Sequence, residues 1–274
     1  MKSEVMTITP ELAAEWLAHN THNRNVRQNV VGKYASDMKA GRWLLTHQGI
    51  AFDADNVLVD GQHRLMAVVQ SGVPVGMLVT RGVNLKHQIA VDDHSIRNVA
   101  DALRLAEDYD VTSMHVAVTH RMMEGLTTNS RRASKQEIKA FLDKYFDGVE
   151  FAIQAFPKAT RGITQAAVRA VVGRAYYSVD SQVLKRFADV LVTGLMGDGE
   201  EAAVTMRNWL LQPVSRYGGS AHQRLVYAKC QRALYSFIRG EPLKRLYAAE
   251  HELFELPASP VRLTDTPAAF PTKP

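Results

Sequence analysis

The chain has 274 residues and a mass of 30.5 kDa, which suits one large domain or two of modest size. Hydrophobic residues make up 46% and charged residues 22%, and the formal net charge is +5, so a fibrous or wholly disordered chain is excluded. A single cysteine, Cys230, excludes an internal disulfide and favours a reducing compartment. No apolar run reaches the roughly 18 residues of a membrane span, and Glu4, Glu11 and Glu15 are unlike a signal peptide. We therefore expect a cytoplasmic protein without a membrane partner.

The first hundred residues predict helices and strands in alternation. Thr9 is placed to cap a helix whose first residue is Pro10, and Gly41 and Gly72 are placed to end two later helices. Two short apolar runs flank turn-forming residues 53–56 and predict a β-hairpin. The expected helices cover 10–20, 26–40, 62–71 and 96–106, and the expected strands cover 50–52, 57–59 and 75–80.

From about residue 111 the pattern becomes almost wholly helical. Ser134 followed by Glu137 is a capping box, and it predicts a helix that runs to about residue 145. Further helices are expected over 113–125, 164–178, 180–193, 200–211 and 220–239. The fold class is therefore predicted as α+β, with a small α/β domain over 1–110, a helical domain over 111–256 and a disordered proline-rich tail over 257–274.

The residues most indicative of chemistry are Asp60, Gly61, Gln62, His63 and Arg64, because a strand is expected to turn directly into a helix there. Glycine permits a tight turn and a close approach by a ligand. Amides in a first helical turn lack partners within the helix, and the helix dipole is positive at that end. Arginine adds a bidentate phosphate donor, and histidine adds a donor that titrates near neutral pH. The five residues predict a site for anionic oxygen atoms.

Asp60 has two interpretations at this turn. Beside bound phosphate, its carboxylate would hold Mg²⁺ or act as a base. In the structural alternative, Asp60 caps the helix and Arg64 is a structural ion-pair partner. From the residues alone, both interpretations stay open.

The segment from Ile8 to Leu103 resembles the ParB/sulfiredoxin-like superfamily, and within it the DGQHR-bearing members of phages and mobile elements. The resemblance rests on ITPELAAEWL, NRNV, YASDMKAGRW, VDGQHRLMAVVQSG and DDHSIRNVADAL. It implies a ParB/sulfiredoxin-like fold whose strand-to-helix turn binds nucleotide phosphates. Gln62 stands where sulfiredoxins have their cysteine, which excludes that thiol chemistry, and the Gly-Glu-Arg-Arg form of partition proteins is absent. Asp60 matches the aspartate of the free-serine kinases, so ATP or another nucleoside triphosphate, such as CTP, is implied together with Mg²⁺.

The same resemblance implies further site residues. Asp92 would orient Arg64 or His63 while Arg97 reaches a phosphate; a structural ion pair between Asp92 and Arg97 is the alternative. Arg24 lies in a loop that passes over the nucleotide in this superfamily, and Gln48 and Gly49 are candidate contacts to a base. The expected catalytic residues are Asp60, His63 and Asp92, with Asp60 also the metal ligand. The expected cofactor-binding residues are Gly61, Gln62, His63, Arg64, Arg97 and Arg24.

The helical domain carries a concentration of positive charge. Residues 207–245 hold eight basic residues and one acidic residue. On the helix expected over 220–239, Cys230 falls on the apolar side, and the opposite side carries Arg224, Lys229, Arg232 and Arg239. This side could follow a DNA backbone through phosphate contacts. A solvated amphipathic helix accounts for the same pattern equally well.

Three functions are carried forward from these observations. The first is a ParB-like protein that binds a nucleoside triphosphate, with or without hydrolysis, and acts on or with DNA in a phage or mobile-element context. The second is an ATP-dependent phosphotransferase acting on a small hydroxyl compound or a modified nucleoside, with Asp60 or Asp92 taking the hydroxyl proton. The third is a nuclease, ranked last because the sequence shows no clustered carboxylates for two metals. A homodimer is carried as an expectation about partners.

Overall fold

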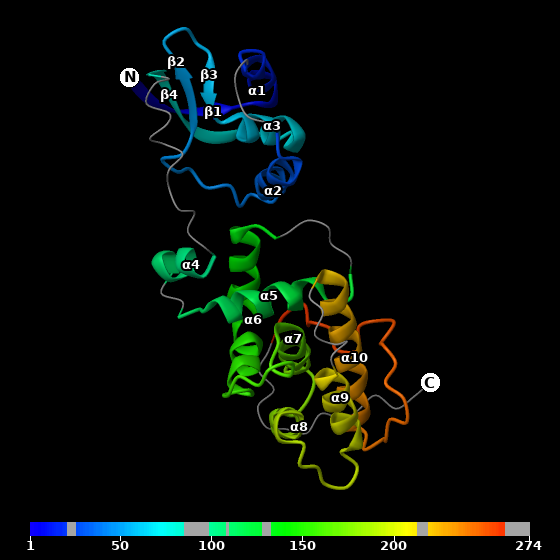
Figure 1. Cartoon of the computed structure of the whole chain (residues 1–274). Helices are drawn as coiled ribbons and strands as arrows, with labels where there is room; N and C mark the ends of the chain where they lie inside the picture. Colours follow the sequence, from blue (N-terminus) through cyan, green and yellow to red (C-terminus); the bar gives the residue numbers. More distant parts are fainter. Residues whose placement is uncertain (21–25, 85–98, 108–109, 128–132, 213–218, 261–274) are drawn as a thin grey trace. The chain divides into compact units, whose positions relative to one another are not determined.

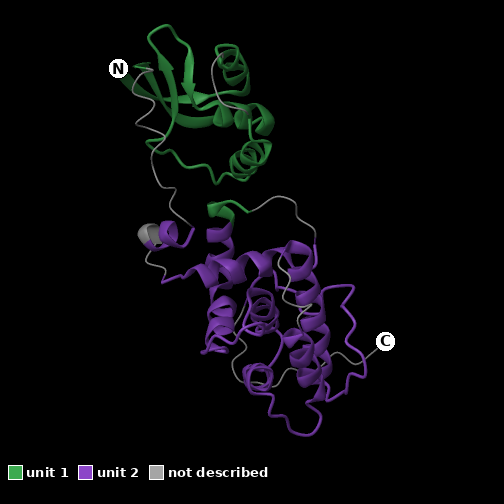
Figure 2. Cartoon of the chain, in the orientation of Figure 1, with its two compact units in different colours: residues 1–97, 130–137 green, residues 98–129, 138–274 purple. Residues whose placement is uncertain are grey.

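The structure is a computed structural model, and it describes residues 1–20, 26–84, 99–107, 110–127, 133–212 and 219–260 (Figure 1). The fold is α+β, as predicted, with a mixed four-stranded sheet and its helices in the N-terminal part and an all-helical region after it. Figure 2 colours the two compact units. Unit 1 comprises Met1–Arg97 and Ser130–Glu137, and unit 2 comprises Asn98–Asn129 and Ile138–Pro274.

The sheet of unit 1 has the strand order β1-β4-β2-β3. Strand β1 (Lys2–Ile8) pairs antiparallel with β4 (Val75–Val83), and β4 pairs parallel with β2 (Ile50–Asp53). Strands β2 and β3 (Leu58–Asp60) form the predicted hairpin, in which Asn56 adopts a φ of 60° in the turn. Strand β3 ends at Asp60, the residue that directly precedes Gly61.

Three helices bury the core of unit 1 against this sheet. They are α1 (Pro10–Leu17), α2 (Gln28–Lys39) and α3 (Gln62–Ser71). The Thr9 hydroxyl accepts from the N–H of Leu12 at 3.2 Å, which confirms the predicted cap of α1. Trp16 packs edge-on against Phe52 with ring centroids 5.1 Å apart, and Leu65 of α3 is fully buried in the same core.

The beginning of α6 (Lys135–Gln154) packs within unit 1. Ser134 and Glu137 form the predicted capping box: the Glu137 N–H donates to the Ser134 hydroxyl at 3.1 Å, and the Ser134 N–H donates to the Glu137 carboxylate at 2.7 Å. The Ser134 hydroxyl also donates to Asp37 of α2 at 2.8 Å, and Arg42 pairs with both Asp37 and Glu137. The division into units therefore assigns 130–137 to unit 1, whereas the sequence placed one boundary near residue 110.

Helix α7 lies at the centre of unit 2, because its residues Ala167–Ala175 are all buried. Helices α5 and α10 pack against α7, and α9 packs against α10. Helix α6 is kinked at Tyr145, whose backbone angles are non-helical, so the helix expected to end near residue 145 ends at this kink and a second helical stretch continues to Gln154. The other helices are α4 (Val99–Glu107), α5 (Ser113–Glu124), α8 (Ser181–Thr193), α9 (Glu201–Leu211) and α10 (Ser220–Ile238).

Residues 241–260 continue as irregular chain along α10. The N–H of Ala249 donates to the carbonyl of Ala228 at 3.1 Å, and the N–H of Leu253 donates to the side chain of Gln231 at 2.9 Å. Phe254 is buried. The proline-rich tail predicted from residue 257 falls outside the described residues from 261 onward. Among the described residues, no helix combines the length and apolar character needed to cross a membrane.

Candidate functional site

The predicted strand-to-helix turn is present as a sharp corner between β3 and α3. Gly61 has a φ of +105°, and a Cβ placed there would lie 3.0 Å from the Cα of Ile50. Only glycine fits this position without displacing backbone. The N–H groups of Arg64 and Leu65 each donate to the carbonyl of Gly61 at 2.9 Å. The amide of Arg64 is therefore used within the helix, and its guanidinium is the group left to meet an anion.

The guanidinium of Arg64 is oriented by two neutral oxygen atoms. One terminal nitrogen donates to the carbonyl of Gly49 at 3.1 Å, and the other donates to the side-chain oxygen of Gln48 at 3.3 Å. Asp60 is more distant, with 3.7 Å between its carboxylate oxygen Oδ2 and the nearest Arg64 nitrogen. The side chain of Arg64 is 14% exposed. Neutral acceptors hold the group in place without cancelling its charge.

Gly49 reaches this position through an unusually close backbone contact. A Cβ at Gly49 would overlap the carbonyl oxygen of Leu78 in β4, so the chain before β2 lies directly on β4. The structure places Gln48 and Gly49 against Arg64, and their suggested contact to a base stays a prediction. In the sequence, only the glycine at position 49, immediately before β2, indicated the close contact with β4.

Asp60 lies at the solvent side of the corner. Its side chain is 57% exposed, and its carboxylate accepts from the N–H of Gly61 at 2.7 Å. Asp60 does not cap α3 as the structural interpretation expected, because the N-cap residue is Gly61 and no side chain caps the helix; the Asp60 carboxylate supports the turn and stands open to solvent beside Arg64. Among the described residues, no group of three histidine, cysteine, aspartate or glutamate side chains could hold a metal ion. Mg²⁺ is nevertheless commonly held by one or two carboxylates together with phosphate and water, a pattern that Asp60 alone fits.

Gln62 and His63 point their side chains into unit 1. They are 4% and 9% exposed. The side-chain oxygen of Gln62 accepts from Asn20 at 3.2 Å, and Nε2 of His63 accepts from the N–H of Arg27 at 3.0 Å. Because Nε2 accepts this bond, that nitrogen is not a proton donor to a phosphate in this conformation. The two side chains tie the start of α3 to the end of α1 and to the start of α2.

Several predicted site residues lie outside the described residues. They are Arg24, Asp92 and Arg97. Their expected roles in orienting Arg64 or His63 and in contacting phosphate stay predictions.

The four predicted nucleic-acid-binding residues, three on α10 and one at its C-cap, fall into two pairs. Lys229 donates to the carbonyl of Leu246 and lies 5.0 Å from the ring centre of Trp209, and burial lowers its pKa. Arg239 forms a 2.7 Å ion pair with Glu241. Arg224 and Arg232 are half-buried. In the described part of the chain, residues 241–260 therefore engage part of the basic side that the sequence left open to DNA.

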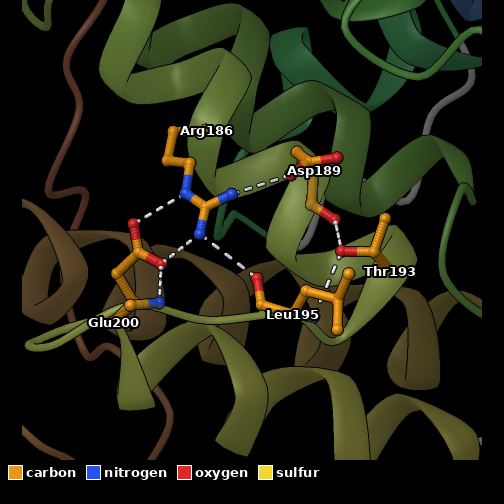
Figure 3. Close-up of polar contacts among 6 residues, drawn as sticks. Arg186, Asp189, Thr193, Leu195 and Glu200 are labelled. Carbon is orange, nitrogen blue, oxygen red and sulfur yellow. Dashed lines mark hydrogen bonds and ion pairs between the residues drawn. The ribbon is translucent and has the colours of Figure 1, made fainter.

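Arg186 shows how differently an arginine is held when its role is structural (Figure 3). Its guanidinium donates to both carboxylate oxygens of Glu200, at 2.8 and 2.7 Å, and to Asp189 at 2.9 Å and the carbonyl of Leu195 at 3.2 Å. Hydrogen bonding to Glu200 raises the pKa of Arg186, and the same contact lowers the pKa of Glu200. Two acids thus neutralise Arg186 and fasten the loop between α8 and α9, whereas Arg64 has one distant carboxylate.

Unit 1 also has an open cavity of about 540 Å³ away from the corner. It is lined by residues of α2, by Gln70 of α3 and by the Arg42–Glu137 ion pair. Lys39 also lines it, and the Arg42 guanidinium there is paired with Glu137 and Asp37.

Comparisons with protein-family models, with curated proteins and with solved structures found no match to this chain. The ParB/sulfiredoxin-like resemblance therefore rests on the sequence motifs alone.

Proposed function

We propose that unit 1 binds the phosphate chain of a nucleoside triphosphate, ATP or CTP, at the corner between β3 and α3. The observation that carries this proposal is the guanidinium of Arg64, oriented by Gly49 and Gln48 at the positive end of a helix. A fixed guanidinium next to a helix N-terminus is a combination that favours phosphate oxygens. The resemblance to phage and mobile-element proteins supports the same ligand class.

The contribution of Arg64 can be bounded from its charge. A unit charge about 4 Å from a phosphate charge gains about 4 kcal/mol at an effective dielectric constant of about 20. After desolvation, a hydrogen bond to a charged group contributes about 1.5–3 kcal/mol net. Removal of the guanidinium should therefore weaken triphosphate binding by roughly 10- to 100-fold.

Asp60 is the residue that would hold Mg²⁺ at this corner. Its exposed carboxylate lies beside Arg64, so Mg²⁺ held there would add a second positive charge next to the guanidinium. Mg²⁺ supplies neutralisation of charge on the phosphate oxygens. Without the metal, the same carboxylate repels phosphate, so we expect triphosphate affinity to depend on Mg²⁺.

Isothermal titration calorimetry with ATP, CTP and GTP, each with and without Mg²⁺, tests the proposal. Arg64→Met is compared with Lys39→Met, which removes the same charge from an exposed position at the C-terminal end of α2. We expect the wild type and Lys39→Met to bind at least one triphosphate and Arg64→Met to bind it 10- to 100-fold more weakly. Absence of binding in the folded wild type, or equal affinity for all three proteins, would refute it.

A phosphotransferase is favoured as the second function by one observation, the 57% exposure of the Asp60 side chain next to Arg64. An open carboxylate at this position can take the proton of an acceptor hydroxyl while Arg64 orients the phosphate. Phosphorus-31 NMR with ATP, Mg²⁺ and a panel of small alcohols and nucleosides detects transfer. Asp60→Asn should then lose transfer and retain ATP binding; a panel without any phosphorylated product counts against this function.

We propose DNA as the partner of unit 2, contacted through Arg224 and Arg232 of α10. We select these two of the four predicted residues because Lys229 already donates to the carbonyl of Leu246 and Arg239 is paired with Glu241. Phosphate contacts of this kind give affinity that falls with salt. In gel shifts on random duplex, Arg224→Ala/Arg232→Ala should weaken binding and Lys229→Ala should leave it nearly unchanged. Equal effects of the two changes would contradict the assignment.

A further inference from the structure

Strand β1 forms one edge of the four-stranded sheet and leaves its outer side open. Its seven residues pair with β4 along their whole length, from Lys2 opposite Arg81 to Ile8 opposite Val75. Among the described residues, no strand pairs with the other side of β1. In an antiparallel edge strand, every second residue directs its N–H and C=O groups away from the sheet. The outer side of β1 thus offers a row of backbone donors and acceptors.

This edge lacks two of the features by which proteins commonly prevent strand addition, a bulge and a proline, although it carries the exposed charged residues Lys2 and Glu4. The pairing of β1 with β4 has no bulge, and β1 contains no proline. Lys2, Ser3, Glu4, Val5 and Thr7 are all exposed, so neither a helix nor a loop of the described chain covers them. Val5, in the middle of the strand, is 59% exposed. An uncovered apolar residue at the centre of a long regular edge favours an interaction surface.

We propose that β1 pairs with β1 of a second copy of this chain, antiparallel and with the two-fold axis at Val5. In this register all seven residues of each strand find a partner, because Val5 is the central residue of Lys2–Ile8. The two Val5 side chains meet at the axis. Ser3 of one copy then stands opposite Thr7 of the other, and hydroxyl pairs of this kind stabilise neighbouring strands. The two sheets become one continuous sheet.

Neighbouring registers are less favourable. Moving the axis to Glu4 places the two Glu4 carboxylates opposite each other, and like charges at opposed positions destabilise a strand pair. Moving the axis to Met6 shortens the paired region and leaves Lys2 and Ser3 without partners. A shift of the strand pairing by a single residue would instead place opposite faces of the two sheets side by side. The sequence of β1 therefore specifies the register centred on Val5.

The contact is small, so the dimer should be weak. Pairing of two strands buries less than the roughly 1,600 Å² of a standard interface. We expect a dissociation constant on the order of 10–100 µM and a concentration-dependent monomer–dimer equilibrium. This inference is independent of the nucleotide site, because the corner at Gly61 lies after β3, at the opposite edge of the sheet.

Oxidative cross-linking of the full chain carrying Val5→Cys tests the register. Opposed residues have Cβ atoms about 4.5–5.5 Å apart, near the distance that a disulfide spans. The native Cys230 is fully buried and does not compete. Val69→Cys, at an exposed position on α3, is the matched control for random collision. We expect Val5→Cys to form the cross-linked dimer at least about tenfold faster than Val69→Cys; equal rates would overturn the proposal.

Sedimentation equilibrium provides the second arm. Val5→Lys brings two like charges to the axis and should leave only monomer, whereas Val5→Thr should keep the wild-type dissociation constant. Because Val5 is exposed, both variants should fold, and circular dichroism checks this. A wild type that stays monomeric at 500 µM, or a dimer that Val5→Lys leaves intact, would overturn the pairing of β1 with β1.

Discussion

Replacing Gly61 by alanine tests the geometry of the corner. A φ of +105° is a strained conformation for a residue with a side chain and costs about 1–3 kcal/mol. The new Cβ would also lie 3.0 Å from the Cα of Ile50, and backbone moves less readily than a side chain. We therefore expect Gly61→Ala to lower the free energy of unfolding of unit 1 by about 3–4 kcal/mol.

Two other glycines separate the sources of this cost. Gly72 has a φ of +68° with open space around its Cβ position, so Gly72→Ala should cost only about 1 kcal/mol of backbone strain. Gly76, in β4, has open space and no positive φ, so Gly76→Ala should change the stability by less than about 0.5 kcal/mol. The predicted order of destabilisation is Gly61→Ala, then Gly72→Ala, then Gly76→Ala.

Urea titration followed by tryptophan fluorescence measures these differences. The chain has three tryptophans, so in a common Trp209→Phe background the two that remain, Trp16 and Trp43, both report on unit 1. If Gly61→Ala destabilises no more than Gly72→Ala, the close contact with Ile50 is not a constraint. The corner would then not be as tight as the proposed anion site requires.

Three further predictions concern unit 2. Arg169 is 6% exposed, and the hydrogen bonds of its guanidinium go to backbone carbonyls, including those of Ala152 and Ile153 near the end of α6. Arg169→Met should therefore lower the free energy of unfolding, measured by denaturant titration, by about 3 kcal/mol or more. Arg169→Lys should recover only part of this loss of stability. Burial raises the pKa of Tyr177 to about 12, so the folded state should lose stability as the pH rises from about 10, where the unfolded phenol ionises, to about 12. Burial raises the pKa of Tyr227 as well, so the test is the difference between the ultraviolet titrations of the wild type and Tyr177→Phe; it should correspond to one phenol that ionises near pH 12, and a difference that is complete near pH 10 would contradict the burial of Tyr177. Burial also raises the pKa of the Cys230 thiol, so Ellman's reagent should react with it only after denaturation, and rapid reaction of the native protein would disprove the packing of α10.

Local sequence signals predicted most of the helices of this chain. Thr9, Ser134 and Gly72 stand at helix ends that the structure confirms, because a cap acts on backbone groups within a few residues of itself. Strand β1 was not predicted. Its sequence KSEVMTI has no apolar run, and most of its residues are exposed, so neither side carries the alternation typical of a half-buried strand.

The candidate site was predicted only in part, because some of its contacts join segments that lie far apart in the sequence. The corner and its glycine follow from residues adjacent in sequence, but the acceptors of Arg64 come from Gln48 and Gly49, which are brought there by the pairing of β2 with β4. The inward orientation of His63 depends on the packing of α2 against α3. Contacts between distant segments leave little trace in a single sequence.

The contacts of α10 illustrate the same limit in unit 2. Its helical pattern placed Lys229 on a solvated basic side, yet the chain after the helix returns and its Leu246 carbonyl accepts from this lysine. The buried Cys230 on the opposite side was predicted correctly. Helical periodicity distinguishes the two sides of a helix, but it does not report which later segment covers the polar one.

The most direct test of the nucleotide site is to map it on the protein. Two-dimensional ¹⁵N–¹H NMR of the full chain, titrated with ATP or CTP and Mg²⁺, reports every amide whose surroundings change. We predict that the largest shifts occur at Gly61–Arg64 and at Gln48–Gly49, with Lys39 unaffected. Saturable shifts confined to other parts of the chain, with these amides unchanged, would contradict the assignment of the phosphate site to the corner of β3 and α3.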